Sequence, residues 1–157
     1  MTTIAYDGRY IACDSRESAG HVILSDNVEK YVVTEDAVYF GAGIPCDIAK
    51  LIEVSDHVAH EYSLEAIILV AEEDGIFTVS QSEEGGVYKN SAVHLDSYAI
   101  GSGAEFAMSA MDFGMTAKEA IEYAMTRDIY TGGEVTVFDT VKMQFVPDDI
   151  ADDDEPS

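Results

Sequence analysis

The second residue of the chain is a threonine, and a threonine at the start of a protein can carry out hydrolysis. Met1 precedes Thr2, and methionine is readily trimmed before a small residue. Thr2 would then hold a hydroxyl nucleophile and, in its own α-amine, the base that accepts the hydroxyl proton. An ordinary first strand is the alternative interpretation, so other residues must support the chemistry.

A cation near the amine would support it. A free α-amine has a pKa of about 7.7–8.0, and a neighbouring ammonium lowers that pKa because it disfavours the charged form. Lys30 could supply the ammonium, and Asp14, which follows a β-prone run, could keep Lys30 charged. The alternatives are an exposed charge at Lys30 and a turn former at Asp14. We expect Arg16 to be structural and to pair with a carboxylate such as Asp128.

Attack on a carbonyl also requires a donor for the oxyanion that forms. Gly41 ends a β-prone run, and a glycine there lets substrate backbone approach without a Cβ in the way. A plain strand-terminating glycine is an equally good interpretation of this residue. The segment Gly101–Gly103 predicts a tight turn from a strand into a helix, in which Ser102 could simply be the N-cap.

Strands are predicted in runs, with helices in two places. Asp7-Gly8 is a hairpin turn signal between two β-prone runs, and Thr116 with Glu119 forms a capping-box signature. Strands are expected at 3–6, 10–13, 21–25, 28–33, 37–41, 66–71, 76–79, 87–88, 93–95, 97–100, 134–139 and 142–146, and helices at 46–61, 104–111 and 116–129. This order predicts an α+β domain of antiparallel sheets with helices packed outside.

Charge and composition exclude several classes of protein. The 157 residues carry a formal net charge of −23, which argues against binding to nucleic acid or to anionic membrane surfaces. No apolar run is long enough to cross a bilayer, and the start lacks the features of a signal peptide. We expect one domain over residues 1–147. Residues 148–157 read as an acidic, disordered tail, either a solubilising end or a docking motif.

Cysteines and histidines indicate neither a disulfide framework nor a metal site. Cys13 and Cys46 form no CxxC motif, and a reducing cytoplasm is the simplest setting for the protein. His57 and His60 lie three residues apart on a predicted helix, where a solvated pair is favoured over metal ligands. We expect no cofactor.

Six short motifs together resemble the proteasome β subunits, and above all the bacterial HslV-type threonine peptidases of the N-terminal nucleophile hydrolase superfamily. None of the motifs is specific alone, but they follow the family order from Thr2 to Asp139. They are Thr2–Ile4, Asp14–Arg16, Asn27–Lys30, Phe40–Gly43, Ala99–Gly103, and Arg127-Asp128 with Thr131–Gly133.

The resemblance implies a four-layer αββα sandwich, two antiparallel sheets flanked by helices, and an endopeptidase enclosed in a homo-oligomeric ring. It implies polypeptide substrates and a possible ATP-dependent unfoldase partner. The residues that match the family's catalytic positions are Thr2, Asp14, Lys30, Gly41, Ser102, Asp128 and Thr131. In the family the serine hydrogen-bonds the terminal amine and the threonine hydroxyl, while the aspartate and its Ser/Thr partner orient the amine.

The chain also departs from the family pattern. The first hairpin is shorter, a residue is missing before Asp47, and the acidic tail is foreign to the HslV type. Only Met1 precedes Thr2, as in that type. The candidate substrate-pocket residues fit no single specificity class, and they are Ser18, Ala19, His21 and Ile44.

Three hypotheses follow from these residues. The leading one is an assembled threonine peptidase that acts after loss of Met1. The second is a catalytically inactive ring subunit with a structural or binding role, which would retain Met1 or lack the site geometry. The third is an N-terminal nucleophile amidase for a small amide, against which the short length and the position of Lys30 argue.

Overall fold

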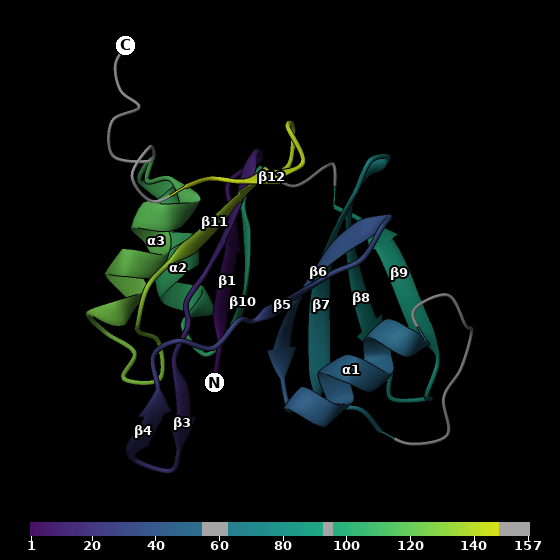
Figure 1. Cartoon of the computed structure of the whole chain (residues 1–157), viewed down its shortest axis with the longest axis horizontal. Coiled ribbons are helices and arrows are strands. Elements are labelled where there is room, and N and C mark those ends of the chain that lie inside the picture. Colours follow the sequence, from purple (N-terminus) through teal and green to yellow (C-terminus); the bar gives the residue numbers. More distant parts are fainter. Residues whose placement is uncertain (55–62, 93–95, 148–157) are drawn as a thin grey trace.

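Two five-stranded antiparallel sheets organise the part of the chain that the structure, a computed structural model, describes: residues 1–54, 63–92 and 96–147 (Figure 1). The first sheet has the order β10-β1-β2-β11-β12, with strands Tyr98–Gly101, Thr3–Tyr6, Tyr10–Cys13, Thr136–Asp139 and Gln144–Phe145. The second has the order β5-β6-β7-β8-β9, with strands Tyr31–Val33, Ala37–Gly43, Ala66–Glu72, Gly75–Gln81 and Val87–Ser91.

A hairpin of β3 (Glu17–Ala19) and β4 (Val22–Ser25) forms a separate two-stranded sheet. Three helices complete the described fold: α1 (Pro45–Glu53), α2 (Ala104–Asp112) and α3 (Ala117–Met125). The predicted capping box of α3 is confirmed, because Thr116 Oγ1 accepts from the Glu119 N–H at 3.2 Å and the Glu119 carboxylate accepts from the Thr116 N–H at 2.9 Å.

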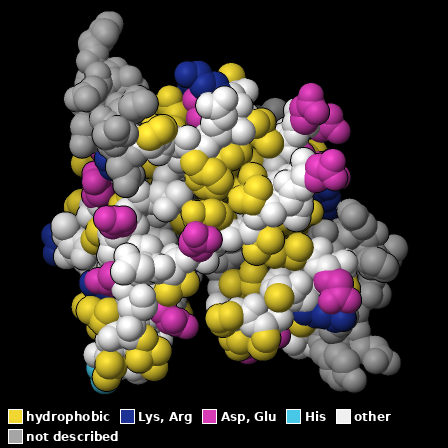
Figure 2. Space-filling view, in the orientation of Figure 1, with side chains coloured by type: hydrophobic (Ala, Val, Ile, Leu, Met, Phe, Trp, Pro, Cys, Tyr) yellow, Lys and Arg dark blue, Asp and Glu magenta, His cyan; other side chains and the backbone are white. Residues whose placement is uncertain are grey.

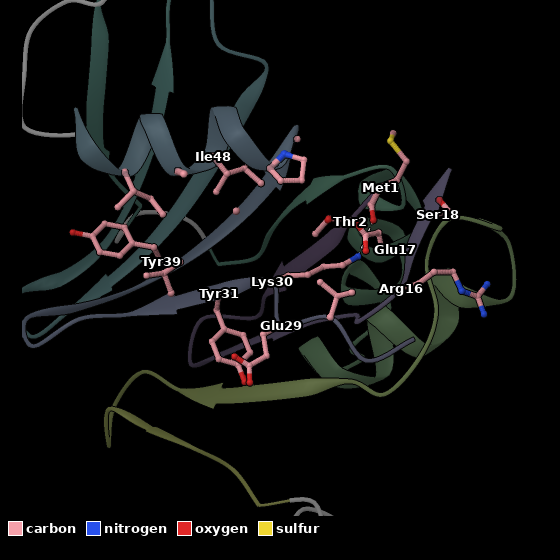
Figure 3. Close-up of a pocket in the computed structure, with 17 residues that line it drawn as sticks. Met1, Thr2, Arg16, Glu17, Ser18, Glu29, Lys30, Tyr31, Tyr39 and Ile48 are labelled. Atoms are coloured by element: carbon pink, nitrogen blue, oxygen red, sulfur yellow. Dashed lines mark hydrogen bonds between the residues drawn. The ribbon is translucent and has the colours of Figure 1, made fainter. Parts of the chain in front are cut away.

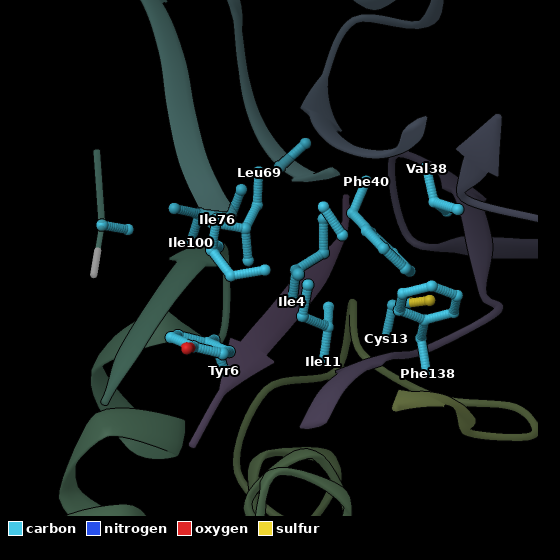
Figure 4. Close-up of a cluster of buried hydrophobic side chains, with 13 residues drawn as sticks. Ile4, Tyr6, Ile11, Cys13, Val38, Phe40, Leu69, Ile76, Ile100 and Phe138 are labelled. Atoms are coloured by element: carbon cyan, nitrogen blue, oxygen red, sulfur yellow. The ribbon is translucent and has the colours of Figure 1, made fainter. Parts of the chain in front are cut away.

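Strand alternation creates the core between the two sheets. Successive side chains of a strand point to opposite faces, so Ile4 and Tyr6 of β1 face the second sheet, where Phe40 of β6 and Leu69 of β7 meet them. Figure 4 shows side chains from both sheets converging in this cluster. The buried apolar area is the main favourable term that holds the two sheets together.

The outer faces of the sheets carry the helices. Ala5, Ala12 and Ala99 of the first sheet pack against α2 and α3, and their small side chains let the helices approach closely. Leu51 of α1 packs against Ile68 and other outward residues of the second sheet. The expected α+β class with antiparallel sheets is therefore confirmed.

Several predicted boundaries were wrong or incomplete. The strand expected over 28–33 is strand only from Tyr31, because the Val28 N–H instead donates to the Ser15 carbonyl at 2.9 Å. Strand β3 was not predicted, and α3 ends at Met125 rather than at residue 129. The described part of the first predicted helix ends at Glu53.

Some sequence-based expectations fall outside the described residues. These are the second half of the helix over 46–61, the strand at 93–95, the tail at 148–157, and the histidines His57, His60 and His94. Among the described helices, none combines the length and the apolar character that crossing a membrane would require.

The aromatic centre of the core gives a stability prediction. Phe138 is 1% exposed, and its ring lies 5.9 Å from that of Phe40 and 4.9 Å from that of Phe145, measured between centroids. Phe138→Ala should lower the free energy of unfolding by about 3–5 kcal/mol, since it leaves a cavity. Urea unfolding followed by far-UV circular dichroism measures this change.

The matched control is Phe113→Ala, because Phe113 is 90% exposed. It should change the free energy of unfolding by at most about 0.5 kcal/mol. Equal losses in the two variants would contradict the assignment of Phe138 to the core.

Candidate active site

The start of β1 is held tightly by the strand beside it. Thr2 is 8% exposed, and its carbonyl oxygen accepts from the Ser102 N–H at 2.8 Å. Gly101, next to Ser102, has a φ of +102°, and a Cβ there would lie 1.7 Å from the Thr2 carbonyl oxygen. Only glycine permits this approach, so the turn after β10 fixes the position of the Thr2 backbone.

A buried ion pair lies at the peptide bond before Thr2. Lys30 Nζ donates to Asp14 Oδ1 at 3.0 Å and to the carbonyl oxygen of Met1 at 2.7 Å. The two charged side chains are 6% and 0% exposed, respectively. The structure thus brings Lys30 and Asp14 together, and it places the ammonium at the residue whose removal would free the Thr2 amine.

Asp14 is satisfied by three donors. Its Oδ1 accepts from the Thr3 N–H at 3.1 Å as well as from Lys30, and its Oδ2 accepts from the Gly132 N–H at 3.0 Å. A buried charge is tolerated only when it is paired and hydrogen-bonded. Asp14 therefore joins the ends of β1 and β2 to the loop before β11.

A second polar network lies on the other side of β1. Asp128 Oδ2 accepts from Ser102 Oγ and from Thr131 Oγ1, each at 2.6 Å, and its Oδ1 accepts from the Tyr130 N–H at 3.1 Å. The hydroxyls of Thr131 and Thr3 lie 2.7 Å apart. The structure brings the three predicted residues Ser102, Asp128 and Thr131 together.

These contacts shift the pKa of Asp128. Burial alone would raise it, but the hydrogen bonds from Ser102, Thr131 and Tyr130 and the positive charge of the chain's amino terminus outweigh burial and lower the pKa below its usual value. Asp128 is therefore a carboxylate at neutral pH, directed at the region of the terminus.

The two neighbouring threonines have different surroundings. Thr3 is 0% exposed, and its Oγ1 accepts from the Gly103 N–H at 2.9 Å and contacts Thr131. Thr2, by contrast, lines an open cleft together with Met1 and Lys30. The Thr3 hydroxyl is thus used in hydrogen bonds that hold the fold together. Thr2 is the threonine that faces the cleft.

Gly41 also lines the cleft, but its N–H group is engaged. It donates to the Lys30 carbonyl at 3.3 Å, in the pairing between β6 and the residue before β5. The N–H group that the sequence analysis assigned to an oxyanion is therefore used within the sheet.

The expected partner of Arg16 was wrong. Its guanidinium binds Asp26, with Nε to Oδ1 at 2.9 Å and Nη2 to Oδ2 at 3.2 Å, and its Nη1 donates to the Ile129 carbonyl at 3.1 Å. Asp128 is instead occupied by hydroxyl and N–H donors. The structural role expected for Arg16 agrees with these contacts, which tie the residue after β4 to the loop after α3.

The cleft has a volume of about 300 Å³, at the lower end of the roughly 300–1,000 Å³ of ligand pockets. Figure 2 shows the surface hollowed between the β3–β4 hairpin and α1, where the chain begins in Figure 1. Of the four candidate pocket residues, Ser18 lines this cleft, whereas Ala19, His21 and Ile44 do not. The described residues contain no group of three metal-ligating side chains.

The fold has known counterparts, although no protein-family model and no curated protein matches the sequence. The structure of Thiobacillus denitrificans BPH in complex with epoxomicin superposes with a TM-score of 0.65 at 20% identity, covering 93% of this chain and 99% of that one. Eukaryotic HslV from Trypanosoma brucei gives a TM-score of 0.63 at 19% identity, covering 88% of this chain and 99% of that one.

The chain therefore has the fold of HslV and BPH, and the predicted resemblance to HslV-type proteins is confirmed. At this level of identity, the similarity establishes the fold alone. Of the motifs that suggested the resemblance, Thr2–Ile4 lies at the start of β1. Those that contain Asp14, Lys30, Ser102 and Asp128 lie at the buried pair and at the Asp128 network, on either side of that strand.

The lowered pKa of Asp128 gives a pH prediction. Because the pKa is lower in the folded than in the unfolded protein, Asp128 stabilises the fold above about pH 4, and this contribution is lost as the pH falls through the folded pKa. The free energy of unfolding of the wild type, from urea titrations, should fall between pH 7 and pH 3 by more than that of Asp128→Asn. Parallel pH profiles would contradict the prediction.

Proposed function

We propose that the chain is a threonine-type endopeptidase that hydrolyses peptide bonds after removal of Met1. The observation that carries the proposal is the Lys30 ammonium, which is buried beside Asp14 and donates to the carbonyl oxygen of Met1. Once Met1 is gone, that donor is available at the place where the Thr2 hydroxyl meets a substrate. The Asp128 network supports the proposal because it supplies a carboxylate near the new amine.

The reaction balances with the groups present. Thr2 Oγ1 attacks the substrate carbonyl carbon while its proton passes to the Thr2 α-amine, and the resulting ammonium protonates the leaving nitrogen as the C–N bond breaks. Water then attacks the acyl ester, giving a proton to the amine. That proton returns to Thr2 Oγ1 as the acid leaves, so the enzyme is restored.

We assign the oxyanion donor to Gly43 rather than to Gly41. Along β6, the Gly41 N–H points to the β5 side, while the Ile44 N–H donates to Glu65 on the β7 side. Strand alternation therefore turns the Gly43 N–H to the β5 side as well, beyond Tyr31, the first residue of β5, where Gly43 lines the cleft. A donor here would stabilise the developing negative charge.

Gly43 also has to be a glycine. Its φ is +131°, and a Cβ there would lie 2.2 Å from the carbonyl oxygen of Glu65. Gly43 was not among the residues predicted to be catalytic. The signal available was its place two residues after Gly41, which is the spacing of N–H groups that share one side of a strand.

The larger assembly rests on the likeness to HslV. The two sheets with α1 on one outer face and α2 and α3 on the other fit a four-layer αββα sandwich. We propose that copies of the chain form a homo-oligomeric ring in the cytoplasm that encloses the sites, with polypeptide substrates and an ATP-dependent unfoldase as possible partner. The apolar side chains exposed on β4 support a contact between copies, and they are Val22, Ile23 and Leu24, which are 51–60% exposed.

The test compares the wild type with Thr2→Ala and Lys30→Ala in a fluorogenic peptide assay. Thr2→Ala should abolish hydrolysis, because it removes the nucleophile, and Lys30→Ala should lower kcat/KM by at least about 10²-fold. Thr126→Ala, which removes a hydroxyl on the exposed C-cap of α3, is the matched control and should keep its activity. Epoxomicin should inhibit the wild type.

Mass analysis of the N-terminus accompanies the assay. Loss of Met1 in the wild type is the expected result. An intact Met1 with no peptidase activity would favour the inactive ring subunit, and equal hydrolysis by wild type and Thr2→Ala would rule out the mechanism.

A further inference from the structure

The cleft has two chemically different ends. Figure 3 shows Met1, Thr2 and Ser18 at one end and Tyr39 with Ile48 at the other. The second end is formed by side chains of β5, β6 and α1, and it is apolar. Further apolar lining residues on these elements are Val32, Pro45, Ala49 and Ile52.

Ile48 lies directly on Gly41 at this apolar end. A Cβ built on Gly41 would come within 2.4 Å of Ile48 Cγ2, so the side chain of Ile48 occupies the space that any other residue at position 41 would take. Ile48 is only partly buried and lines the cleft. Ile48 therefore limits the room at the apolar end of the cleft, between α1 and β6.

The charges around the cleft do not favour an acidic side chain in it. The two cationic lining residues, Lys30 and Arg16, are each paired with an aspartate. Two exposed carboxylates, Glu17 and Glu29, also line the cleft, and no ion pair involves either of them within the described part of the chain. These carboxylates would therefore repel the carboxylate of an acidic substrate side chain.

A basic side chain fits the apolar end no better. Reaching past Thr2 toward Ile48, Ala49 and Ile52, its cation would lose part of its hydration, and neither lining carboxylate, Glu17 or Glu29, belongs to the elements that form this end. Taking a charge out of water without a partner is costly. Moving an apolar side chain from water to this end is favourable, and the free energy falls in proportion to the apolar area that is buried.

We propose that this cleft binds the side chain on the acyl side of the scissile bond, that it selects large apolar residues such as leucine and phenylalanine, and that Ile48 determines the size it accepts. The inference rests on the proposed peptidase function, since it places the substrate carbonyl at Thr2. The substrates of the site are then polypeptides cleaved after large apolar residues.

The experiment uses the full chain after loss of Met1 has been verified by mass. Fluorogenic peptides that differ only in the residue before the cleaved bond, namely Leu, Phe, Ala, Glu or Arg, are compared by kcat/KM. The Leu and Phe peptides should exceed the Glu and Arg peptides by at least about tenfold. Each activity is measured against Thr2→Ala, so that only Thr2-dependent hydrolysis is counted.

Two variants test the role of Ile48. Ile48→Ala should raise the ratio of Phe to Leu hydrolysis, because it deepens the apolar end, and Ile48→Asp should raise hydrolysis of the Arg peptide relative to Leu. Val141→Ala, in the turn between β11 and β12, truncates an exposed apolar side chain outside the cleft lining and should leave every ratio unchanged. Circular dichroism checks that each variant folds, and Ile48→Ala alone suffices if Ile48→Asp does not.

The outcomes separate the two proposals. Thr2-dependent hydrolysis that prefers Glu or Arg, or ratios that ignore both Ile48 variants, would overturn the specificity while leaving the peptidase function in place. Absence of Thr2-dependent hydrolysis for every peptide would overturn the peptidase function, and the specificity with it.

Discussion

The buried pair of Lys30 and Asp14 is the interaction on which the geometry of the site depends. An unpaired ammonium at this depth would cost several kcal/mol, and the pair is tolerated because Asp14 also accepts two backbone N–H groups, those of Thr3 and Gly132. Each donor comes from a different part of the chain. One carboxylate therefore fixes the start of β1, the approach to β5 and the loop before β11 relative to one another.

Much of the fold was predictable because many of its strands are short β-prone runs bounded by turn signals. Where one face of a strand meets the other sheet and the opposite face meets a helix, as in β1, both faces are buried, and the run reads as continuously apolar. Strand β3 escaped prediction for the opposite reason. It has three residues, Glu17 to Ala19, none of them buried, so no hydrophobic pattern marks it. Strand β5 begins later than predicted, at Tyr31, because the Val28 N–H donates to the Ser15 carbonyl and the Lys30 side chain binds Asp14.

The candidate site was predictable in its residue types but not in its hydrogen bonds. The motifs pointed to Ser102, Asp128 and Thr131 as one group, and these residues do lie together. Each follows an element that ends near the first strand. Sequence spacing cannot tell which N–H group of β6 pairs with the neighbouring strand. It therefore could not show that the Gly41 N–H donates to the Lys30 carbonyl and is not free for an oxyanion. Nor can it show that a turn carries Asp26 to Arg16, a contact that depends on the hairpin between them.

The pleat of β1 explains why two adjacent threonines have different roles. Side chains at consecutive positions of a strand lie on opposite faces, so a hydroxyl at position 3 turns toward the start of α2 and is satisfied there by Gly103 and Thr131. Position 2 then faces the opposite side, toward the cleft that Lys30 also lines. A register shift of one residue would exchange the two hydroxyls. The close approach of Gly101 to the Thr2 carbonyl opposes such a shift, and through it the backbone of β10 determines which threonine faces the cleft.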